Sequence, residues 1–313
     1  MSTISVNHLL ENVSDKENNE KLHKLVIEPY QHILRIPGKQ FRSRMAAALN
    51  HWLNVPFDKM IQIGEIVQLL HNGSLLIDDI QDGSVLRRGV PAAHQLFGIR
   101  FTMNTACYVI THALIQTNEA GGEAANKIFC HELLELHRGQ GTDIFWRDNA
   151  ICPSEKEYKL MVIRKTGGLF LMLIRLLQLF SENKRDFSKL AGLVGLYFQI
   201  RDDYCSLNSK DYTKKKTFCE DLSEGKMSFP VVHSVITMHD REVLHMLRKR
   251  STKFEDKKYC VELLKKNGSL QYTADVLELI EREVRSEIAN HGGNPFMEQL
   301  IDELAAWKTM ERN

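Results

Sequence analysis

Apolar residues recur at every third or fourth position through much of this chain. The pattern is clearest between Met60 and Ile80. One face of that segment carries Ile63, Ile66, Val67, Leu70 and Leu75, which is typical of an amphipathic helix. The stretch from Gly167 to Phe180 is apolar on nearly every side but has only fourteen residues and includes Arg175. Since a membrane span needs about 20 apolar residues, we expect a buried helix here.

Helix-breaking residues separate these segments. Ser154 to Glu157 forms a capping box that opens a helix after Pro153, and three glycine-containing pairs predict turns between helices. These pairs are Gly121-Gly122, Asn267-Gly268 and Gly292-Gly293. No alternating strand pattern, internal repeat or low-complexity linker follows residue 20. We therefore predict one all-α domain over residues 21–313, preceded by a polar, disordered tail over residues 1–20 that is neither a secretory signal nor a transit peptide.

Composition excludes several classes of protein. With 43% hydrophobic residues, the chain can bury a substantial core. Its 41 basic and 40 acidic residues give a net charge of +1, so no overall field favours nucleic acid or an anionic membrane surface. The six cysteines show no Cys-x-x-Cys spacing. We interpret them as reduced thiols and expect a cytoplasmic protein without a membrane span.

An acidic cluster, Asp78, Asp79 and Asp82, ends the helix predicted around residue 70. Asp78 and Asp82 lie one helical turn apart, and like charges in that relation repel by about 0.2–0.5 kcal/mol. A bound cation removes this repulsion. Because every donor is an oxygen, Mg²⁺ is favoured over zinc. Arg87 and Arg88 follow directly and suit a substrate that carries phosphate. Taken alone, the cluster could also be a solvated helix end.

A second acidic cluster follows the apolar segment from Leu190 to Ile200. Asp202 and Asp203 repeat the first arrangement, but Ser206 occupies the position that corresponds to Asp82. If both clusters faced one cavity, five carboxylates would converge, which requires several divalent ions or strongly raised pKa values. A group of magnesium ions holding a diphosphate satisfies this requirement. The two clusters together favour a metal site over two solvated helix ends.

Basic residues occur in short runs elsewhere in the chain. Lys165 is notable because it precedes a Gly-Gly pair inside an apolar helix, where glycine permits close approach of the backbone to a ligand. Other runs contain Lys39 with Arg42, and Lys214 to Lys216 with Lys226. Each alone is typical of a solvated surface. Neither Gly38-Lys39 nor the Gly-Lys pair ending at Lys226 has the further residues of a phosphate-binding P-loop.

Several strings together resemble the trans-isoprenyl diphosphate synthases, in particular the short eukaryotic geranylgeranyl diphosphate synthases. The resemblance extends from Leu25 to Gly293. Its strings are Gly38 to Arg42, His71 to Asp82, Leu86 to Gly89, Glu135 to Gly141, Lys165 to Phe170, Phe198 to Tyr204 and Phe218 to Lys226. The resemblance implies an isoprenoid-synthase-type helical bundle around a deep central cavity, with the two aspartate motifs facing each other across its mouth. It also implies a homodimer or a higher homo-oligomer.

The resemblance further implies a role for each matching residue. An allylic diphosphate would be held through up to three Mg²⁺ ions, whose ligands would be Asp78, Asp82 and Asp202; Asp79 and Asp203 complete the catalytic motifs. The departing diphosphate would be stabilised by Arg87, Lys165, Lys216 and Lys226. Isopentenyl diphosphate would be bound by Lys39, Arg42, His71 and Arg88. Thr166 and Gln199 would offer oxygen dipoles to the allylic cation.

Product length is expected to depend on residues below the first aspartates. Ser74 lies one turn before Asp78 on the same face, with Gly73 beside it, and both are small. Their size permits a twenty-carbon product. The bulkier run from Leu171 to Arg175 would narrow the cavity wherever that helix faced it.

Three functions remain open at this stage. The first is a prenyltransferase that condenses dimethylallyl, geranyl or farnesyl diphosphate with isopentenyl diphosphate to give geranylgeranyl diphosphate. The second is a terpene synthase, a lyase that ionises a prenyl diphosphate such as geranyl diphosphate. Cys107, His112 and Ser206 depart from the residues expected in the family and favour it. The third is a non-catalytic subunit that regulates a partner synthase, which the intact acidic motifs disfavour.

Overall fold

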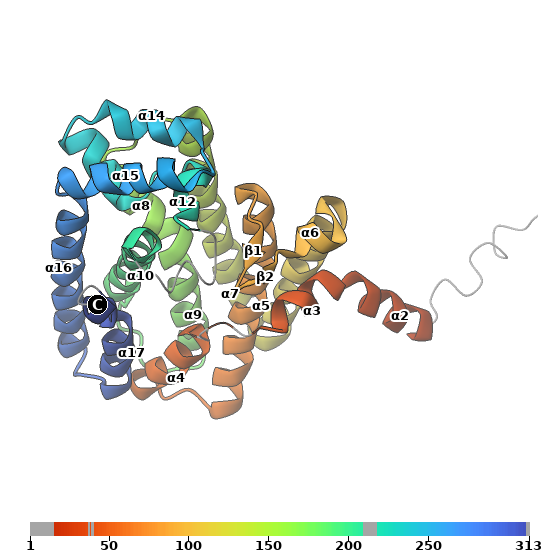
Figure 1. Cartoon of the computed structure of the whole chain (residues 1–313). Coiled ribbons are helices and arrows are strands. Elements are labelled where there is room, and N and C mark those ends of the chain that lie inside the picture. Colours follow the sequence, from red (N-terminus) through yellow and green to blue (C-terminus); the bar gives the residue numbers. More distant parts are fainter. Residues whose placement is uncertain (1–15, 37, 39–40, 209–217, 311–313) are drawn as a thin grey trace, which may run out of the picture.

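The computed structural model describes residues 16–36, 38, 41–208 and 218–310, and nearly every element in them is a helix (Figure 1). The all-α prediction is therefore confirmed. The first helices are α2 (Lys16–Val26), α3 (Glu28–Leu34), α4 (Phe41–Leu53), α5 (Phe57–Asp82), α6 (Ala93–Phe97), α7 (Ile99–Asn149), α8 (Glu155–Val162) and α9 (Gly168–Gln178). The remaining helices are α10 (Ser188–Asn208), α12 (Glu220–Glu224), α13 (Phe229–Val232), α14 (Arg241–Lys249), α15 (Phe254–Lys266), α16 (Ser269–Asn290), α17 (Pro295–Ala305) and α18 (Trp307–Met310).

Three short elements interrupt this pattern. Two are π-helical turns, η1 (Ile163–Gly167) and η2 (His233–Thr237). The third is a hairpin in which β1 (Leu86–Arg87) pairs antiparallel with β2 (Val90–Pro91), directly after the first acidic cluster. The hairpin has no alternating pattern long enough to have predicted it.

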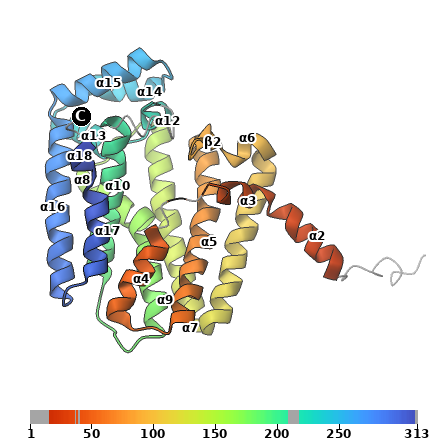
Figure 2. The ribbon, with the colours of Figure 1, turned by 60° about the horizontal axis from the view of Figure 1, so that its bottom comes forward.

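Helix α7 consists of two antiparallel arms. Gly122 has a left-handed, non-helical conformation (φ 62°, ψ −148°), and the chain reverses there. Lys59, near the start of α5, donates a hydrogen bond to the carbonyl oxygen of Ala120, whereas Arg147 near the end of α7 contacts Asp82 at the end of α5. Both arms therefore lie beside α5 (Figure 2). The predicted turn at Gly121-Gly122 is confirmed.

The other predicted boundaries are also confirmed. Ser154 and Glu157 form the capping box at the start of α8. The pair Asn267-Gly268 separates α15 from α16, and Gly292-Gly293 separates α16 from α17. Gly268, Gly292 and Gly293 all have positive φ, which glycine adopts without a steric penalty.

The apolar stretch after Gly167 lies in the centre of the bundle. Met172, Leu173 and Ile174 are at most 1% exposed, so the expected bulky run packs into the core. Arg175 forms an ion pair with Glu132 of α7. The prediction of a buried helix is thus confirmed.

The N-terminal boundary differs from the prediction. Helix α2 begins at Lys16, within the segment expected to be a disordered tail, so that prediction is wrong for residues 16–20. Residues 1–15 lie outside the described part. In Figure 1, α2 extends away from the bundle, beyond α3. Among the described helices, none is both long enough and apolar enough to cross a membrane.

Candidate active site

A cavity of about 870 Å³ opens between the helices of the bundle and carries both acidic clusters. Asp78 and Asp82 line it from the C-terminal end of α5, and Asp202 lines it from α10. This volume lies within the usual range for small-molecule sites. The two aspartate clusters therefore face one cavity, as predicted.

Each cluster also contains one aspartate that points into the protein. Asp79 is 1% exposed and accepts a 2.7 Å hydrogen bond from Arg87 Nε. Asp203 is completely buried and accepts hydrogen bonds from four groups. The donors are Tyr158 Oη at 2.5 Å, the Phe229 backbone N–H at 2.8 Å, Lys226 Nζ at 2.9 Å and Gln199 Nε2 at 3.0 Å.

This placement corrects the prediction for these two aspartates. Neither Asp79 nor Asp203 lines the cavity, although both were expected among the catalytic residues. Instead, each holds a cation that does line it: Asp79 holds Arg87, and Asp203 holds Lys226. They are buried anchors that fix the positions of cavity cations.

The π-helical turn η1 carries the next predicted residues. Lys165 Nζ lies 2.7 Å from Asp143 Oδ2 and 3.9 Å from Asp78 Oδ1. Burial opposes its charge, but the three carboxylates Asp143, Asp78 and Asp82 outweigh that effect and raise the pKa of Lys165. Thr166 Oγ1 donates a 3.1 Å hydrogen bond to Gln199 Oε1, and both residues line the cavity.

Glycines allow neighbouring helices to approach η1 very closely. A Cβ added to Gly139 of α7 would lie 2.6 Å from the backbone nitrogen of Lys165. A Cβ added to Gly195 of α10 would lie 2.6 Å from Gly167 Cα. The backbone around Lys165 and Thr166 is therefore enclosed by direct contact with two other helices.

A basic cluster lies on another part of the cavity wall. Arg42, His71 and Arg88 line it, and none of them forms an ion pair with a carboxylate in the described part of the chain. Burial, followed by the charge of Arg88, lowers the pKa of Arg42 to about 10. Burial and then Arg42 lower the pKa of His71 well below its ordinary value. Within the same described residues, Arg42 Nε is buried without a hydrogen-bond acceptor.

Arg88 is held in this cluster by backbone contacts. Its guanidinium donates to the carbonyl oxygens of Ile36 (2.6 Å) and Ile33 (3.3 Å). A Cβ on Gly38 would lie 2.8 Å from Arg88 Nη2, so glycine leaves space for the side chain. Two predicted lysines, Lys39 and Lys216, lie outside the described residues.

The second arm of α7 contributes three residues that the sequence analysis missed. Gln140 Nε2 donates to Gln81 Oε1 (2.8 Å) and to Asp78 Oδ1 (3.3 Å). Asp143 is the partner of Lys165 described above, and all three residues, Gln140, Asp143 and Arg147, line the cavity. Their positions, three and then four residues apart, place them on one helical face. This spacing of polar residues along one helical face is the sequence pattern from which a shared role could have been predicted.

Arg147 contacts the last aspartate of the first cluster. It forms an ion pair with Asp82, and its Nη2 donates to the carbonyl oxygen of Gln81 at 2.8 Å. Burial, followed by the charge of Asp78, raises the pKa of Asp82 to about 6, although Lys165 and Arg147 oppose the shift. The electrostatic potential at the acidic end of α5 is therefore strongly negative even with these cations in place.

The two small residues predicted to set product length lie in different places. Ser74 lines the cavity. Gly73 does not, because a Cβ there would lie 3.2 Å from side-chain atoms of Val109 and Ile110 in the first arm of α7. Of these two small residues, Ser74 therefore faces the cavity and Gly73 packs against α7. The wall near Ser74 is mostly apolar and includes Ile77, Ile110, Leu133, Leu136 and His137.

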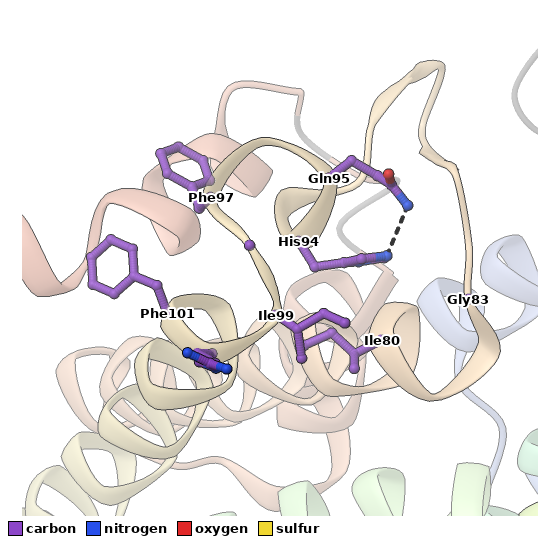
Figure 3. A pocket seen from close by; sticks show the side chains of 9 residues that line it. Ile80, Gly83, His94, Gln95, Phe97, Ile99 and Phe101 are labelled. Atoms are coloured by element: carbon purple, nitrogen blue, oxygen red, sulfur yellow. Dashed lines mark hydrogen bonds between the residues drawn. The ribbon is translucent and has the colours of Figure 1, made fainter.

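A second cleft, of about 720 Å³, lies between the end of α5, α6 and the start of α7 (Figure 3). In Figure 3, Ile99 lies beside Ile80, Phe97 and Phe101 lie together on one side, and His94 and Gln95 contact each other at 3.1 Å. It has no aspartate or glutamate in its lining. The chemistry of the acidic motifs therefore belongs to the central cavity.

The donor set of the central cavity fits magnesium completed by substrate. In the described ranges, no three His, Cys, Asp or Glu side chains come close enough to form a metal site from protein ligands alone. Mg²⁺ usually binds through one or two carboxylates, with waters and substrate phosphates as its other ligands. Asp78, Asp82 and Asp202, facing one cavity, fit that arrangement.

Comparison with known proteins identifies the family. The polyprenyl synthetase profile matches residues 23–264, and the chain belongs to this family. The chain is 53% identical to a terpene synthase of Matsumurasca onukii, over 96% of this chain and 98% of the relative. It is 44% identical to a geranylgeranyl pyrophosphate synthase of Dictyostelium discoideum (89% and 92% covered) and 41% identical to one of Mucor circinelloides f. lusitanicus (93% and 96% covered). The resemblance stated from the motifs is thereby confirmed at the level of the family.

Proposed function

We propose that the protein is a Mg²⁺-dependent prenyltransferase that condenses an allylic diphosphate with isopentenyl diphosphate to give geranylgeranyl diphosphate. The observation that carries this proposal is the half-buried cluster of Arg42, His71 and Arg88, which line the cavity. Buried cations are normally paired with anions, because an unpaired buried charge is costly. None of these three side chains forms an ion pair with a carboxylate in the described residues, although the charge of Asp79 acts on Arg88. The cluster is therefore suited to an anionic ligand, and a second diphosphate substrate supplies one.

The cavity cations that are paired with carboxylates suit the allylic diphosphate. Arg87 and Lys165 line the cavity and are held by carboxylates, so their charges are in place before substrate binds. Lys226 is held in the same way by Asp203. Preorganised cations stabilise negative charge as it develops on a leaving group. They therefore favour departure of diphosphate and formation of an allylic cation.

The metal ligands in this proposal are Asp78, Asp82 and Asp202. Bound Mg²⁺ would supply Lewis-acid stabilisation of the leaving diphosphate. Thr166 and Gln199 line the cavity, and their oxygen atoms would stabilise the cation through their dipoles. The apolar wall beyond Ser74 would hold the hydrocarbon chain and exclude water from the cation.

The test is product analysis with purified protein, Mg²⁺ and an allylic diphosphate, with and without isopentenyl diphosphate. We expect an elongated diphosphate only when isopentenyl diphosphate is present. The variant Arg42→Ala should raise KM for isopentenyl diphosphate by about tenfold or more, the cost of losing a charged hydrogen bond, with little change in KM for the allylic substrate. Equal effects on both substrates contradict the assignment of the basic cluster.

Terpene synthase activity is the second candidate. It is favoured by the 53% identity to a protein named terpene synthase, which exceeds the identity to the two synthases named above. A lyase ionises one prenyl diphosphate and has no use for a second diphosphate site. A volatile product formed without isopentenyl diphosphate would favour the lyase. Lack of reaction with every prenyl diphosphate would favour the non-catalytic subunit.

We also infer that the chain forms a homodimer. Leu22 and Leu25 of the projecting helix α2 are about half exposed, and so is Ile115 on the first arm of α7. Exposed apolar side chains on neighbouring elements favour burial against a partner. Sedimentation velocity is expected to give twice the monomer mass. A monomer at micromolar concentration contradicts the inference.

A further inference from the structure

Two charged residues outside the central cavity lie directly behind Arg147. Arg147 Nε donates to Asp148 Oδ1 at 3.1 Å. Arg250, which follows α14, donates from Nη2 to the same Asp148 oxygen (3.1 Å) and to the backbone carbonyl of Arg147 (3.1 Å). The C-terminal end of a helix carries partial negative charge, which favours a cation bonded to its last carbonyls. Arg250 therefore fastens the end of α7 to α14.

Arg250 also lies against the turn that carries Lys226. A Cβ added to Gly225 would lie 2.9 Å from Arg250 Nε, and Gly225 has φ +78°. Arg250 itself is left-handed (φ 46°), a conformation that few non-glycine residues adopt. The guanidinium thus contacts two segments that present cations to the cavity: the end of α7, with Arg147, and residues 224–227.

These contacts lie in a side cleft of about 530 Å³. Arg147 lines both this cleft and the central cavity. In the neighbouring turn the residues alternate, with Glu224 and Lys226 lining the central cavity and Gly225 and Met227 lining the side cleft. Arg147 and the turn therefore form the partition between the two spaces, and Arg250 supports the partition from outside.

We propose that Arg250 is a positioning residue for the diphosphate site, acting through Asp148 and Arg147 on Asp82. The guanidinium of Arg147 bonds on three sides, to Asp82, to the carbonyl oxygen of Gln81 and to Asp148. A planar guanidinium group that is hydrogen-bonded on three sides has one orientation, whereas an arginine side chain without such bonds samples many rotamers. Loss of the outer support releases Arg147, and Asp82 then loses its fixed orientation toward the metal. The inference rests on the proposed function.

The test compares three variants: Arg250→Ala, Arg250→Lys and the matched control Arg248→Ala. Arg248 is exposed in the same side cleft, so its removal changes the local charge equally, but it has no hydrogen bond with Arg147 or Asp148. We expect Arg250→Ala to raise the Mg²⁺ concentration for half-maximal rate by about two- to fivefold, in line with the loss of a partly exposed ion pair. KM for isopentenyl diphosphate should not change, Arg250→Lys should recover part of the loss, and Arg248→Ala should match the wild type.

A double-mutant cycle tests the route through Arg147. In the background Arg147→Gln, the further change Arg250→Ala should have no added effect on Mg²⁺ dependence, because the residue through which Arg250 acts is absent. Fully additive effects overturn the proposal. An equal change in the Arg248→Ala control overturns it as well, since that result would indicate a general charge effect.

A binding measurement separates this inference from the proposed function. Mg²⁺ with inorganic pyrophosphate should raise the melting temperature of the wild type, because both bind only the folded protein. The rise should be smaller for Arg250→Ala than for Arg248→Ala. If prenyl diphosphates gave no product but this difference persisted, the proposed reaction would fail and the positioning role would stand. Equal rises, or no rise in the wild type, overturn the positioning role.

Discussion

Adjacent aspartates in the second cluster should differ sharply in what they contribute. Asp203 accepts hydrogen bonds from four donors and is completely buried, whereas Asp202 lines the cavity. The perturbation is Asp203→Asn, compared with Asp202→Asn as its matched control. Both changes remove one carboxylate and preserve side-chain size.

The expected magnitude follows from the donors around Asp203. An asparagine offers one acceptor oxygen, and its NH₂ group takes the place of the other. Because only the Tyr158 hydroxyl can turn to accept from that NH₂ group, at least one of the four donors loses its acceptor. Each buried group without a partner costs about 1–3 kcal/mol, and the ammonium of Lys226 also loses its counter-ion. Burial raises the pKa of Asp203, whereas the charge of Lys226 and the hydrogen bonds from Tyr158 and Phe229 oppose that shift. We expect Asp203→Asn to lower the free energy of unfolding by about 3–5 kcal/mol.

Urea denaturation and steady-state kinetics measure the two effects separately. For Asp202→Asn we expect a change in the free energy of unfolding below about 0.5 kcal/mol, typical of a change away from the core, with a large loss of turnover. For Asp203→Asn we expect a clearly lower denaturation midpoint. Equal destabilisation by the two variants would refute the division into a cavity-facing and an anchoring aspartate. A stable Asp203→Asn protein would refute it too.

Further predictions concern the first cluster and the packing around the cavity. Asp78→Ala should lower turnover by about 100-fold or more, which is the usual effect of removing one group that stabilises charge in the transition state. The circular dichroism spectrum should not change. Near-normal turnover contradicts the assignment of Asp78 as a metal ligand. Ser74→Phe should shorten the main product, measured by chromatography, because the larger side chain fills the cavity. Gly73→Ala should lower the free energy of unfolding, measured by denaturation, by about 1–3 kcal/mol without altering product length. Gly195→Ala should lower the melting temperature strongly, because its Cβ would overlap Gly167; an unchanged melting temperature rejects this close contact.

Helical spacing explains which site residues could be predicted. Asp78 and Asp82 are four residues apart, so the sequence placed them on one face, and the cavity lies on that face. Spacing alone does not reveal which of two adjacent aspartates faces inward, since that depends on how the helix is rotated against its neighbours. The family resemblance predicts a catalytic role for Asp79, whereas in the structure it is buried and holds Arg87. The same limit applies to Gly73 and Ser74, which are adjacent in the sequence but differ in whether they face the cavity.

Tertiary contacts account for the residues that were missed. Gln140, Asp143 and Arg147 belong to neither acidic cluster, and their role depends on α7 reversing at Gly122 so that its second arm meets the end of α5. A single sequence reveals the turn but not the rotation of the arm that follows. The polar face of the second arm gains its role from the end of α5, which it contacts through Gln140 and Arg147.

The cavity wall at η1 differs from the wall near Ser74, because glycines bring neighbouring backbones into direct contact with η1. Near Lys165, main chain packs on main chain through Gly139 and Gly195, so little can be substituted there without moving a whole helix. Around Ser74 and Leu133 the lining consists of side chains, which can be exchanged one at a time. In the proposed function, the hydrocarbon product would therefore change by exchange of lining residues, while the wall that carries Lys165 would stay the same. Relatives of this chain carry two different names, terpene synthase and geranylgeranyl pyrophosphate synthase.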